Sequence, residues 1–326
     1  MLLNHSPVML KECLEFLGLT GPDEVRARAL GKVVVDCTLG LGGHSVEILK
    51  AIGPAGHLYA FEKDEENLKV AEERLGKVVS EMGAAQNFKI FHDSFSSLTD
   101  RLRREGVSQV DAILFDLGLS SPHVDDSARG FSFSKDGPLD MRFDRSMTTG
   151  AAGRTAADIL NTASEKELAD IFYYFGEERH SRKLASRIAE SRKKEEFQST
   201  LQFADFVKKV FGPAYKRMPQ IFQSLRIAVN EELSALELGL AQAIELLAPQ
   251  GRVTVLSYHS LEDRLVKHFF KQLATDLRDP TDIYGQRVLR SKSLSLLTNK
   301  PIRPTQEEVD QNPRSRSALL RAAEKL

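Results

Sequence analysis

The sequence predicts an α/β protein: a doubly wound, Rossmann-like, largely parallel sheet with an inserted all-helical domain. Three observations carry this prediction. Short β-branched runs alternate with longer helical patterns as far as Asp116, which is typical of parallel βαβ units. A glycine-dense turn follows the first of these runs, between Val33 and Ser45. Only helical patterns then occur from Ala156 to Val210, and the alternation of strand and helix returns near Arg252.

The first half of the chain supplies the parallel strands. They are expected at residues 32–37, 57–61, 88–92 and 110–116. Helices are expected between them at 45–51, 65–79 and 95–105. The second helix is the clearest, because Leu68, Ala71 and Leu75 recur at helical spacing.

After Asp116 the rhythm changes. Residues 118–144 are rich in Gly, Ser, Asp and Pro and contain isolated aromatics, a composition that indicates a long, ordered loop. The helical insertion is expected at 144–213, which leaves 1–143 and 214–326 for the sheet domain. In the returning part we expect a helix at 218–247, a strand at 252–257, a helix at 261–273 and a last strand near 315–323.

Composition excludes several classes of protein. The formal net charge is −1, so the chain as a whole does not attract nucleic acid, and RNA binding would need a local basic patch. Cys13 and Cys37 are the only cysteines, which excludes a disulfide framework and a thiolate metal site. The N-terminal stretch lacks the apolar core of a signal peptide, and no apolar run approaches the roughly 18 residues of a membrane span. We therefore expect a cytoplasmic protein without a membrane or metal partner.

The strongest local signal is the segment VVVDCTLGLGGHS, residues 33–45. Gly40, Gly42 and Gly43 let the backbone approach a ligand closely, and the helix that follows offers free N–H groups to an anion. Either a dinucleotide pyrophosphate or the carboxylate and ribose of S-adenosylmethionine would fit such a turn. The dinucleotide pattern GxGxxG fails at Ser45, whereas Asp36 with glycines four and six residues later is closer to a methyltransferase turn.

Residues at the ends of the later strands agree with a nucleoside cofactor. Glu62 lies about 20 residues past the turn, where a carboxylate can accept both ribose hydroxyls. Phe95 follows the third strand and could cover the adenine, although a core aromatic is the plainer interpretation. Asp116 ends the fourth strand, at the edge where open α/β sheets place their ligands.

The segment DLGLSSPHVDDSARGFSFSKDGPLDMRFD, residues 116–144, closely resembles the MraW family of ribosomal RNA small-subunit methyltransferases. The resemblance spans nearly the whole chain. It includes LGGHS, GEERHSRK, FQSLRIAVNEEL, SYHSLEDRLVK and NPRSRSALLR. It implies a class I S-adenosylmethionine-dependent methyltransferase that methylates N4 of a cytidine in the decoding region of 16S rRNA, the residue numbered 1402 by convention.

The resemblance also assigns residues. It implies cofactor contacts by Gly42, Gly43, His44, Glu62, Phe95 and Asp116. The family usually has Gln after the SSP motif, where this chain has His123, and an imidazole can still form a hydrogen bond to the cofactor. Cys37 replaces a glycine that is common in the family, and its small side chain should leave the turn intact.

An exocyclic cytosine amine is a poor nucleophile, because its lone pair is conjugated into the ring. The enzyme must hold the nitrogen in line with the methyl group and accept its N–H hydrogens, and positioning alone contributes several kcal/mol. Asp116, Ser120, Ser121 and Pro122 are the expected catalytic residues, with no single base assigned. Phe131, Phe133 and Phe143 are candidates for stacking on the flipped base, and core packing explains each of them equally well.

The histidine and carboxylates of SYHSLEDR allow two interpretations. Ser260 and Asp263 are expected as a helix N-cap and a first-turn acid, and contact of His259 with the base is the less favoured alternative.

A basic run in the insertion is the expected RNA contact. The segment from Arg179 to Lys194 contains seven cationic residues and a single acidic residue, Glu190. The spacing of four of them predicts one face of a helix, and a solvated surface is the ordinary alternative. The expected RNA-binding residues are Arg179, Arg182, Lys183, Arg187 and Lys194.

Competing functions remain open at this point. The same cofactor chemistry could act on DNA cytosine or on a protein side chain, and a noncatalytic RNA-binding factor could keep a vestigial cofactor fold. An NAD-linked oxidoreductase is disfavoured by the broken dinucleotide pattern. The expected partner is 16S rRNA in the small ribosomal subunit, and the sequence leaves the oligomeric state open, a homodimer included.

Overall fold

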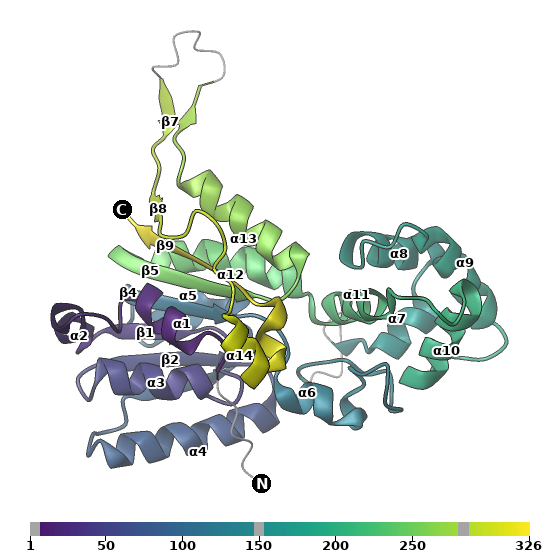
Figure 1. Ribbon diagram of the computed structural model, residues 1–326, viewed down its shortest axis with the longest axis horizontal. Helices are drawn as coiled ribbons and strands as arrows, with labels where there is room; N and C mark the ends of the chain where they lie inside the picture. Colours follow the sequence, from purple (N-terminus) through teal and green to yellow (C-terminus); the bar gives the residue numbers. More distant parts are fainter. Residues whose placement is uncertain (1–6, 147–152, 280–286) are drawn as a thin grey trace. The chain divides into compact units, whose positions relative to one another are not determined.

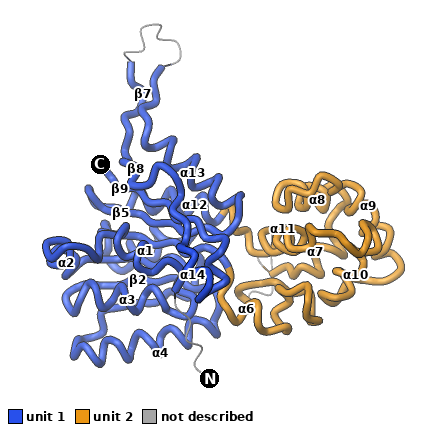
Figure 2. Tube along the Cα trace, in the orientation of Figure 1, with its two compact units in different colours: residues 1–118, 235–326 blue, residues 119–234 orange. Residues whose placement is uncertain are grey.

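The structure is a computed structural model that describes residues 7–146, 153–279 and 287–326. The chain divides into two compact units (Figure 2). The sheet unit comprises Met1–Gly118 and Ala235–Leu326, and the helical unit comprises Leu119–Ser234. A helical segment is therefore inserted into an α/β unit, as predicted.

The sheet unit is built on seven strands in the order β3-β2-β1-β4-β5-β9-β8 (Figure 1). The strands are β1 (Val33–Asp36), β2 (His57–Glu62), β3 (Phe88–His92), β4 (Val110–Asp116), β5 (Leu247–Ser257), β8 (Leu294–Leu296) and β9 (Leu319–Lys325). The first five are parallel, and β9 runs antiparallel to both β5 and β8. The order reverses between β1 and β4, which places a ligand crevice at the carboxyl ends of these two strands.

Helices cover both faces of this sheet (Figure 1). One face packs against α1 (Leu10–Phe16), α2 (Asp23–Ala29), α3 (Gly43–Ile52) and α4 (Glu65–Glu81), and the other against α5 (Leu98–Arg104), α12 (Glu232–Leu246) and α13 (Ser260–Leu273). Successive strand residues alternate between the two cores: Leu114 belongs to the first and Phe115 to the second. Because both faces are buried, the strands read as continuous apolar runs.

Shorter elements complete the sheet unit. They are η1 (Phe95–Ser97), β6 (Leu277–Arg278), β7 (Val288–Arg290), α14 (Gln306–Gln311) and η5 (Pro313–Ser317). The strands β6 and β7 pair with each other in a separate two-stranded sheet.

The helical unit has its own hydrophobic core. Its elements are α6 (Ser121–Asp125), η2 (Ser127–Arg129), α7 (Ala156–Thr162), α8 (Glu165–Asp170), the π-helix η4 (Ile171–Phe175), α9 (Ser181–Ser191), α10 (Thr200–Phe211) and α11 (Met218–Asn230). Phe172, Leu184, Phe203 and Leu225 are fully buried in that core.

The helical unit extends further in both directions than the predicted 144–213. Leu139 and Met141, from the Gly- and Ser-rich loop, are buried in the helical core. The Asn230 amide, at the end of α11, donates to the Met141 carbonyl at 2.7 Å and accepts from the Phe143 N–H at 2.8 Å. The loop and α11 therefore pack with the insertion rather than with the sheet.

The helix predicted at 218–247 is two helices. Glu231 adopts φ +53°, a left-handed conformation that ends α11, and α12 starts at the next residue. Leu247 already belongs to β5, which is longer than the predicted 252–257. The last strand starts at Leu319 rather than near Ser315, because Ser315 lies in the 3-10 turn before it.

Among the residues that the structure describes, no helix combines the length and apolarity that crossing a bilayer requires.

Candidate active site

The end of β1 anchors the predicted ligand turn. Asp36 is buried, with 1% of its surface exposed. Its carboxylate accepts the Ser45 hydroxyl at 2.7 Å and the Thr38 N–H at 3.0 Å. Burial raises the pKa of Asp36, and these hydrogen bonds partly offset the rise. Asp36 is therefore a structural residue that closes the loop onto the first turn of α3.

The glycines of the turn are required by its backbone. Gly40 has φ +52° and Gly42 has φ +80°, values that side chains rarely adopt. A Cβ on Gly43 would stand 2.8 Å from Pro7 Cγ. No side chain caps α3, so its first N–H groups remain available to an anionic ligand. The turn and the start of α3 therefore offer backbone N–H groups to an anion, as expected from the sequence.

Glu62 lies at the carboxyl end of β2, beside the turn. Its carboxylate accepts the Asp64 N–H at 2.7 Å. Burial raises the pKa of Glu62 to about 7, against the hydrogen bonds that favour its charged form. Asp64 itself caps α4, accepting the N–H groups of Glu66 and Asn67. Glu62 is thus a carboxyl group held in place at the end of β2, with a pKa of about 7. Its contact with a ribose stays a prediction.

Asp116, at the carboxyl end of β4, is held at three points. Its Oδ1 accepts the Tyr258 hydroxyl at 2.7 Å, and its Oδ2 lies 3.3 Å from His44 Nδ1. Its backbone N–H donates to Thr38 Oγ1 at 2.6 Å. This carboxylate therefore has a fixed position and orientation at the switch point of the sheet.

His44 is the cationic partner of Asp116. Its ring is buried, and its Nε2 lies 3.0 Å from the Val8 carbonyl oxygen while Nδ1 faces Asp116. Both ring nitrogens face acceptors, so both must carry protons. Burial alone would lower the pKa of His44, but the hydrogen bond and the charge of the Asp116 carboxylate help to raise it well above its usual value. The His44 side chain is thereby committed to Asp116 and Val8.

Tyr258 was not predicted from the sequence. Tyr258 follows the last residue of β5, which is parallel to β4 and next to it in the sheet. Its position after a parallel strand, at the same sheet edge as Asp116, was the signal that could have identified it as a site residue. Burial and the Asp116 carboxylate raise the pKa of the Tyr258 hydroxyl well above its usual value. The hydroxyl therefore stays protonated and donates a hydrogen bond to Asp116.

Phe95 lies at the start of η1. Its ring meets Phe115 edge-on, with centroids 5.4 Å apart, and a Cβ on Gly239 would be only 2.7 Å from its Cδ2. The ring therefore rests on α12 and is only partly buried. Its contact with adenine stays a prediction.

The SSP loop begins the helical unit. Ser120 Oγ and His123 Nδ1 are 3.0 Å apart. The His123 ring is buried next to Phe131 and Phe143, with both centroid distances 5.1 Å. Ser121 and Pro122 form the first turn of α6. The structure thus brings Ser120 and His123 together, within a stack of aromatic rings.

Two of the three loop phenylalanines are explained by this packing. Phe131 and Phe143 stack on each other with centroids 5.7 Å apart, and Phe131 is buried in the helical core. Phe133 is 37% exposed and meets Phe222 edge-on.

The SYHSLEDR motif forms a helix cap, but Ser260 is not the capping residue. His259 occupies the N-cap of α13 and accepts the Glu262 N–H, while the Glu262 carboxylate accepts the His259 N–H. Asp263 forms a two-point ion pair with Arg321, at 2.7 and 3.1 Å. The imidazole ring can serve as a cap because its unprotonated nitrogen accepts the bond that a hydroxyl usually accepts.

The predicted RNA-binding cations all lie on the surface of the helical unit. Those expected to share one helix are Arg179, Arg182, Lys183 and Arg187, and all four are exposed. The prediction of one helix is wrong for Arg179, because α9 starts only at Ser181. Glu177 has φ +50°, a left-handed conformation that interrupts the helical backbone two residues before Arg179. Lys194 is exposed beyond the end of α9.

The sheet order, the glycine turn and the acidic strand ends define an S-adenosylmethionine-dependent methyltransferase of the doubly wound α/β type. Residues 2–326 match the family model described as the MraW methylase family. The chain belongs to this family, and S-adenosylmethionine is its cofactor.

Two relatives show how far the similarity extends. The ribosomal RNA small subunit methyltransferase H of Dictyoglomus thermophilum is 42% identical over 324 residues, which cover 98% of this chain and 96% of that protein. The protein of the same name from Bacteroides thetaiotaomicron is 43% identical over 323 residues, covering 98% and 97%. The resemblance predicted from the motifs is confirmed.

Proposed function

We propose that the protein transfers a methyl group from S-adenosylmethionine to the exocyclic N4 of one cytidine in the decoding region of 16S rRNA. The names of its relatives support a small-subunit rRNA substrate. The arrangement of Asp116 between Tyr258 and His44 carries the assignment of the reacting group. A ribosomal substrate places the reaction in the cytoplasm.

The sheet unit has the groups that a methyl donor requires. The N–H groups at Gly43 and His44, in the first turn of α3, would hold its carboxylate, with Gly42 shaping the turn. Glu62 would accept the ribose hydroxyls, and Phe95 would cover the adenine. When bound, the cofactor supplies an electrophilic methyl group. The family resemblance supports His123 as a further polar contact to the cofactor.

Asp116 would orient the target amine rather than act as a strong base. Its two oxygens already receive hydrogen bonds from Tyr258 and His44, which hold the carboxylate in one orientation. Each oxygen keeps a second lone pair for an N–H of the base. An amine needs no strong base, because its proton becomes acidic as the nitrogen acquires the methyl group. Ser120, Ser121 and Pro122, which follow Asp116 closely in the chain, are proposed to complete the acceptor set.

The cysteines argue against methylation at cytosine C5. That reaction needs an enzyme nucleophile to add to the ring, usually a thiolate. Cys13 and Cys37 are both buried, and burial raises the pKa of both thiols. Neither is suited to attack a base, which supports the amine over C5 as the proposed site of methylation.

The helical unit is proposed to bind the RNA. Its cations Arg179, Arg182 and Lys194 are exposed, and in the described part of the chain none of them forms an ion pair. Tyr173 and Tyr174, in the π-helix just before them, are 54% and 62% exposed. Proteins hold single-stranded nucleic acid with exposed aromatic rings and cations, and the helical unit offers both.

Labelled methyl transfer tests this proposal. The purified protein would be offered small ribosomal subunits, naked cytosine-containing DNA and a protein mixture, with tritiated S-adenosylmethionine. Label should enter only the rRNA of the subunits. Label in DNA or protein would overturn the substrate, and absence of label from all three would overturn the activity.

A further inference from the structure

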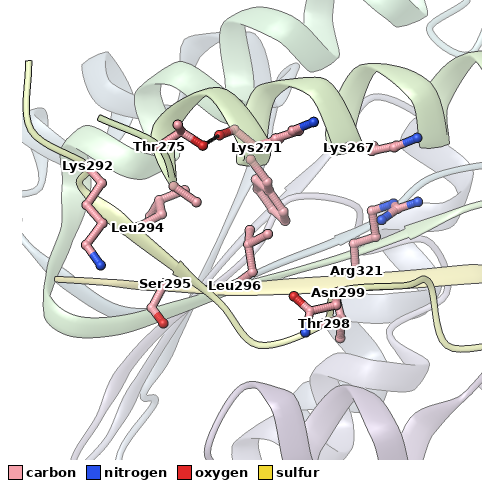
Figure 3. Close-up of a pocket in the computed structure, with 12 residues that line it drawn as sticks. Lys267, Lys271, Thr275, Lys292, Leu294, Ser295, Leu296, Thr298, Asn299 and Arg321 are labelled. Carbon is pink, nitrogen blue, oxygen red and sulfur yellow. Dashed lines mark hydrogen bonds between the residues drawn. The ribbon is translucent and has the colours of Figure 1, made fainter. Parts of the chain in front are cut away.

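A cavity of about 520 Å³ lies in the sheet unit between α13 and the β8–β9 edge of the sheet (Figure 3). Lys267 and Lys271 line it from α13, Lys292 from the segment before β8, and Arg321 from β9. Among the residues that the structure describes, none of those that line it is acidic. The cavity has the volume of an ordinary small-ligand site and a strongly positive wall.

The three lysines of this cavity are free to bind an anion. Lys267, Lys271 and Lys292 are exposed, and none of their ammonium groups has an ion-pair or hydrogen-bond partner among the described residues. Arg321 is held at Nε and Nη2 by Asp263, which fixes the guanidinium plane while Nη1 keeps its hydrogens. The cavity therefore combines three exposed lysines with one arginine whose guanidinium is held in place by Asp263.

The floor of the cavity is apolar. Phe270 and Leu294 are almost fully buried beneath it, and Leu296 is partly exposed. Asn299 and Ser295 add exposed polar groups at the β8 side (Figure 3). A solvated lysine surface needs no such floor. Cations around an apolar floor suit a ligand that has a phosphate and a flat, weakly polar ring, which is a nucleotide.

The cavity is separate from the methyl-donor crevice but shares its edge of the sheet. β8 is three strands from β4, or roughly 15 Å across the sheet. It runs parallel to β4 and β5, so Thr298 and Asn299, which follow it, lie at the same sheet edge as Asp116. The three lysines lie along the cavity at increasing distance from that edge, in the order Lys267, Lys271 and Lys292 (Figure 3).

The geometry points to a second RNA subsite, in which this cavity holds a nucleotide of the rRNA strand that flanks the methylated cytidine. The proposal rests on the rRNA substrate proposed above. A free nucleotide has the same chemistry and is the alternative source of the ligand, so the experiment separates the two.

The first test is the double variant Lys271→Glu/Lys292→Glu. Both side chains are exposed, so folding should be retained, and unchanged affinity for S-adenosylhomocysteine checks it. Affinity for a short single-stranded RNA of the target sequence should fall about tenfold, and the slope of log affinity against log salt should shrink by about 2. At saturating RNA, kcat should be unchanged. The control is Lys69→Glu/Lys77→Glu on α4, two exposed lysines on the other face of the sheet.

A fluorescent reporter provides the second test. The chain has no tryptophan, so Leu296→Trp places a single reporter on the cavity floor. The RNA should quench its emission by stacking, and adenosine monophosphate should do so only at far higher concentration.

Unchanged RNA affinity in the glutamate variant, with no quenching by RNA, would overturn the subsite. Quenching by adenosine monophosphate alone would overturn the RNA assignment in favour of a free nucleotide. If both tests succeed while the unmodified protein methylates no ribosomal subunit, the subsite stands and the proposed function fails.

Discussion

Two sets of charged groups, one at the carboxyl ends of β1 and β4 in the sheet unit and one on the surface of the helical unit, differ in how they are paired. In the sheet unit, Asp36 and Asp116 are bound on both oxygens by named donors, and His44 is bound on both nitrogens. In the helical unit, Arg179 and Arg182 are exposed and, within the described residues, unpaired. The groups proposed to position the reacting atom are held in place when the chain folds, whereas the proposed RNA contacts are completed only on binding. Substitutions in the two sets of groups should therefore affect different kinetic constants.

The largest effect is expected for Asp116→Asn. The amide keeps the size of the side chain but loses the charge that pairs with His44 and one of the two acceptors. We expect kcat for methyl transfer to fall roughly 100-fold or more, with RNA affinity within about twofold of the unmodified protein.

Asp111→Asn is the matched control for that experiment. Asp111 lies at the opposite end of β4, where its carboxylate accepts the Val33 N–H at 2.8 Å, and an amide oxygen can replace that acceptor. Its activity should be near normal. A fully active Asp116→Asn protein would contradict the role of Asp116.

Tyr258→Phe should have the next largest effect. A hydrogen bond to a charged group contributes about 1.5–3 kcal/mol, so kcat should fall about tenfold or more while KM for RNA stays constant. Tyr258 is a positioning residue, so combining the change with Asp116→Asn should add little to the single effect of Asp116→Asn. Additive losses in steady-state assays would mean that Tyr258 acts independently of Asp116.

Glu62 should make donor binding depend on pH. Its pKa is about 7, and the protonated carboxyl loses its ability to accept both ribose hydroxyls. Calorimetric affinity for S-adenosylhomocysteine should therefore fall as pH falls below about 7, by at most about tenfold per pH unit. The Glu62→Gln protein should bind more weakly and lack this component. Equal pH profiles for the two proteins would remove Glu62 from the ribose site.

The raised pKa of Glu62 also affects stability. Donor affinity should rise with pH, whereas the contribution of Glu62 to the free energy of unfolding should fall. The folded state holds the Glu62 proton more tightly than the unfolded state does, so this group lowers the free energy of unfolding as pH rises from 4.5 to about 7. Glu62→Gln should therefore gain stability relative to the unmodified protein over this range, in urea titrations at several pH values.

The smallest effect is expected for Arg179→Ala/Arg182→Ala in the helical unit. KM for RNA should rise about fivefold, the salt slope should fall by about 2, and kcat should not change. Lys208→Ala on α10 is the control, because this lysine is already paired with Asp205 at 2.9 Å. A loss of kcat without a change in KM for RNA would contradict the proposal that these arginines only bind RNA.

The strands and the donor turn could be predicted because local sequence determines them. β2, β3 and β4 occupy nearly the predicted residues, and the positive φ of Gly40 and Gly42 is what glycine in such a turn implies. Glu62 and Asp116 could be selected as site candidates because parallel strands bring their carboxyl ends to one edge.

The remaining features depend on long-range contacts. The left-handed Glu231 that divides α11 from α12 has no signal in residue type. The packing of Met141 against the helices depends on Asn230, far away in the chain. β8 is three residues long and exists through its pairing with β9. The end of β5 placed Tyr258 at the right edge of the sheet, but its hydrogen bond to Asp116, 142 residues earlier, depends on the fold.

The central claim is that the oriented carboxylate of Asp116 directs methyl transfer to an amine. The most direct measurement is nucleoside mass spectrometry of rRNA after reaction of small subunits with deuterium-labelled S-adenosylmethionine. The account predicts label in N4-methylcytidine at one position, and its loss with Asp116→Asn. Label in 5-methylcytidine, or undiminished N4 label with the variant, would contradict it.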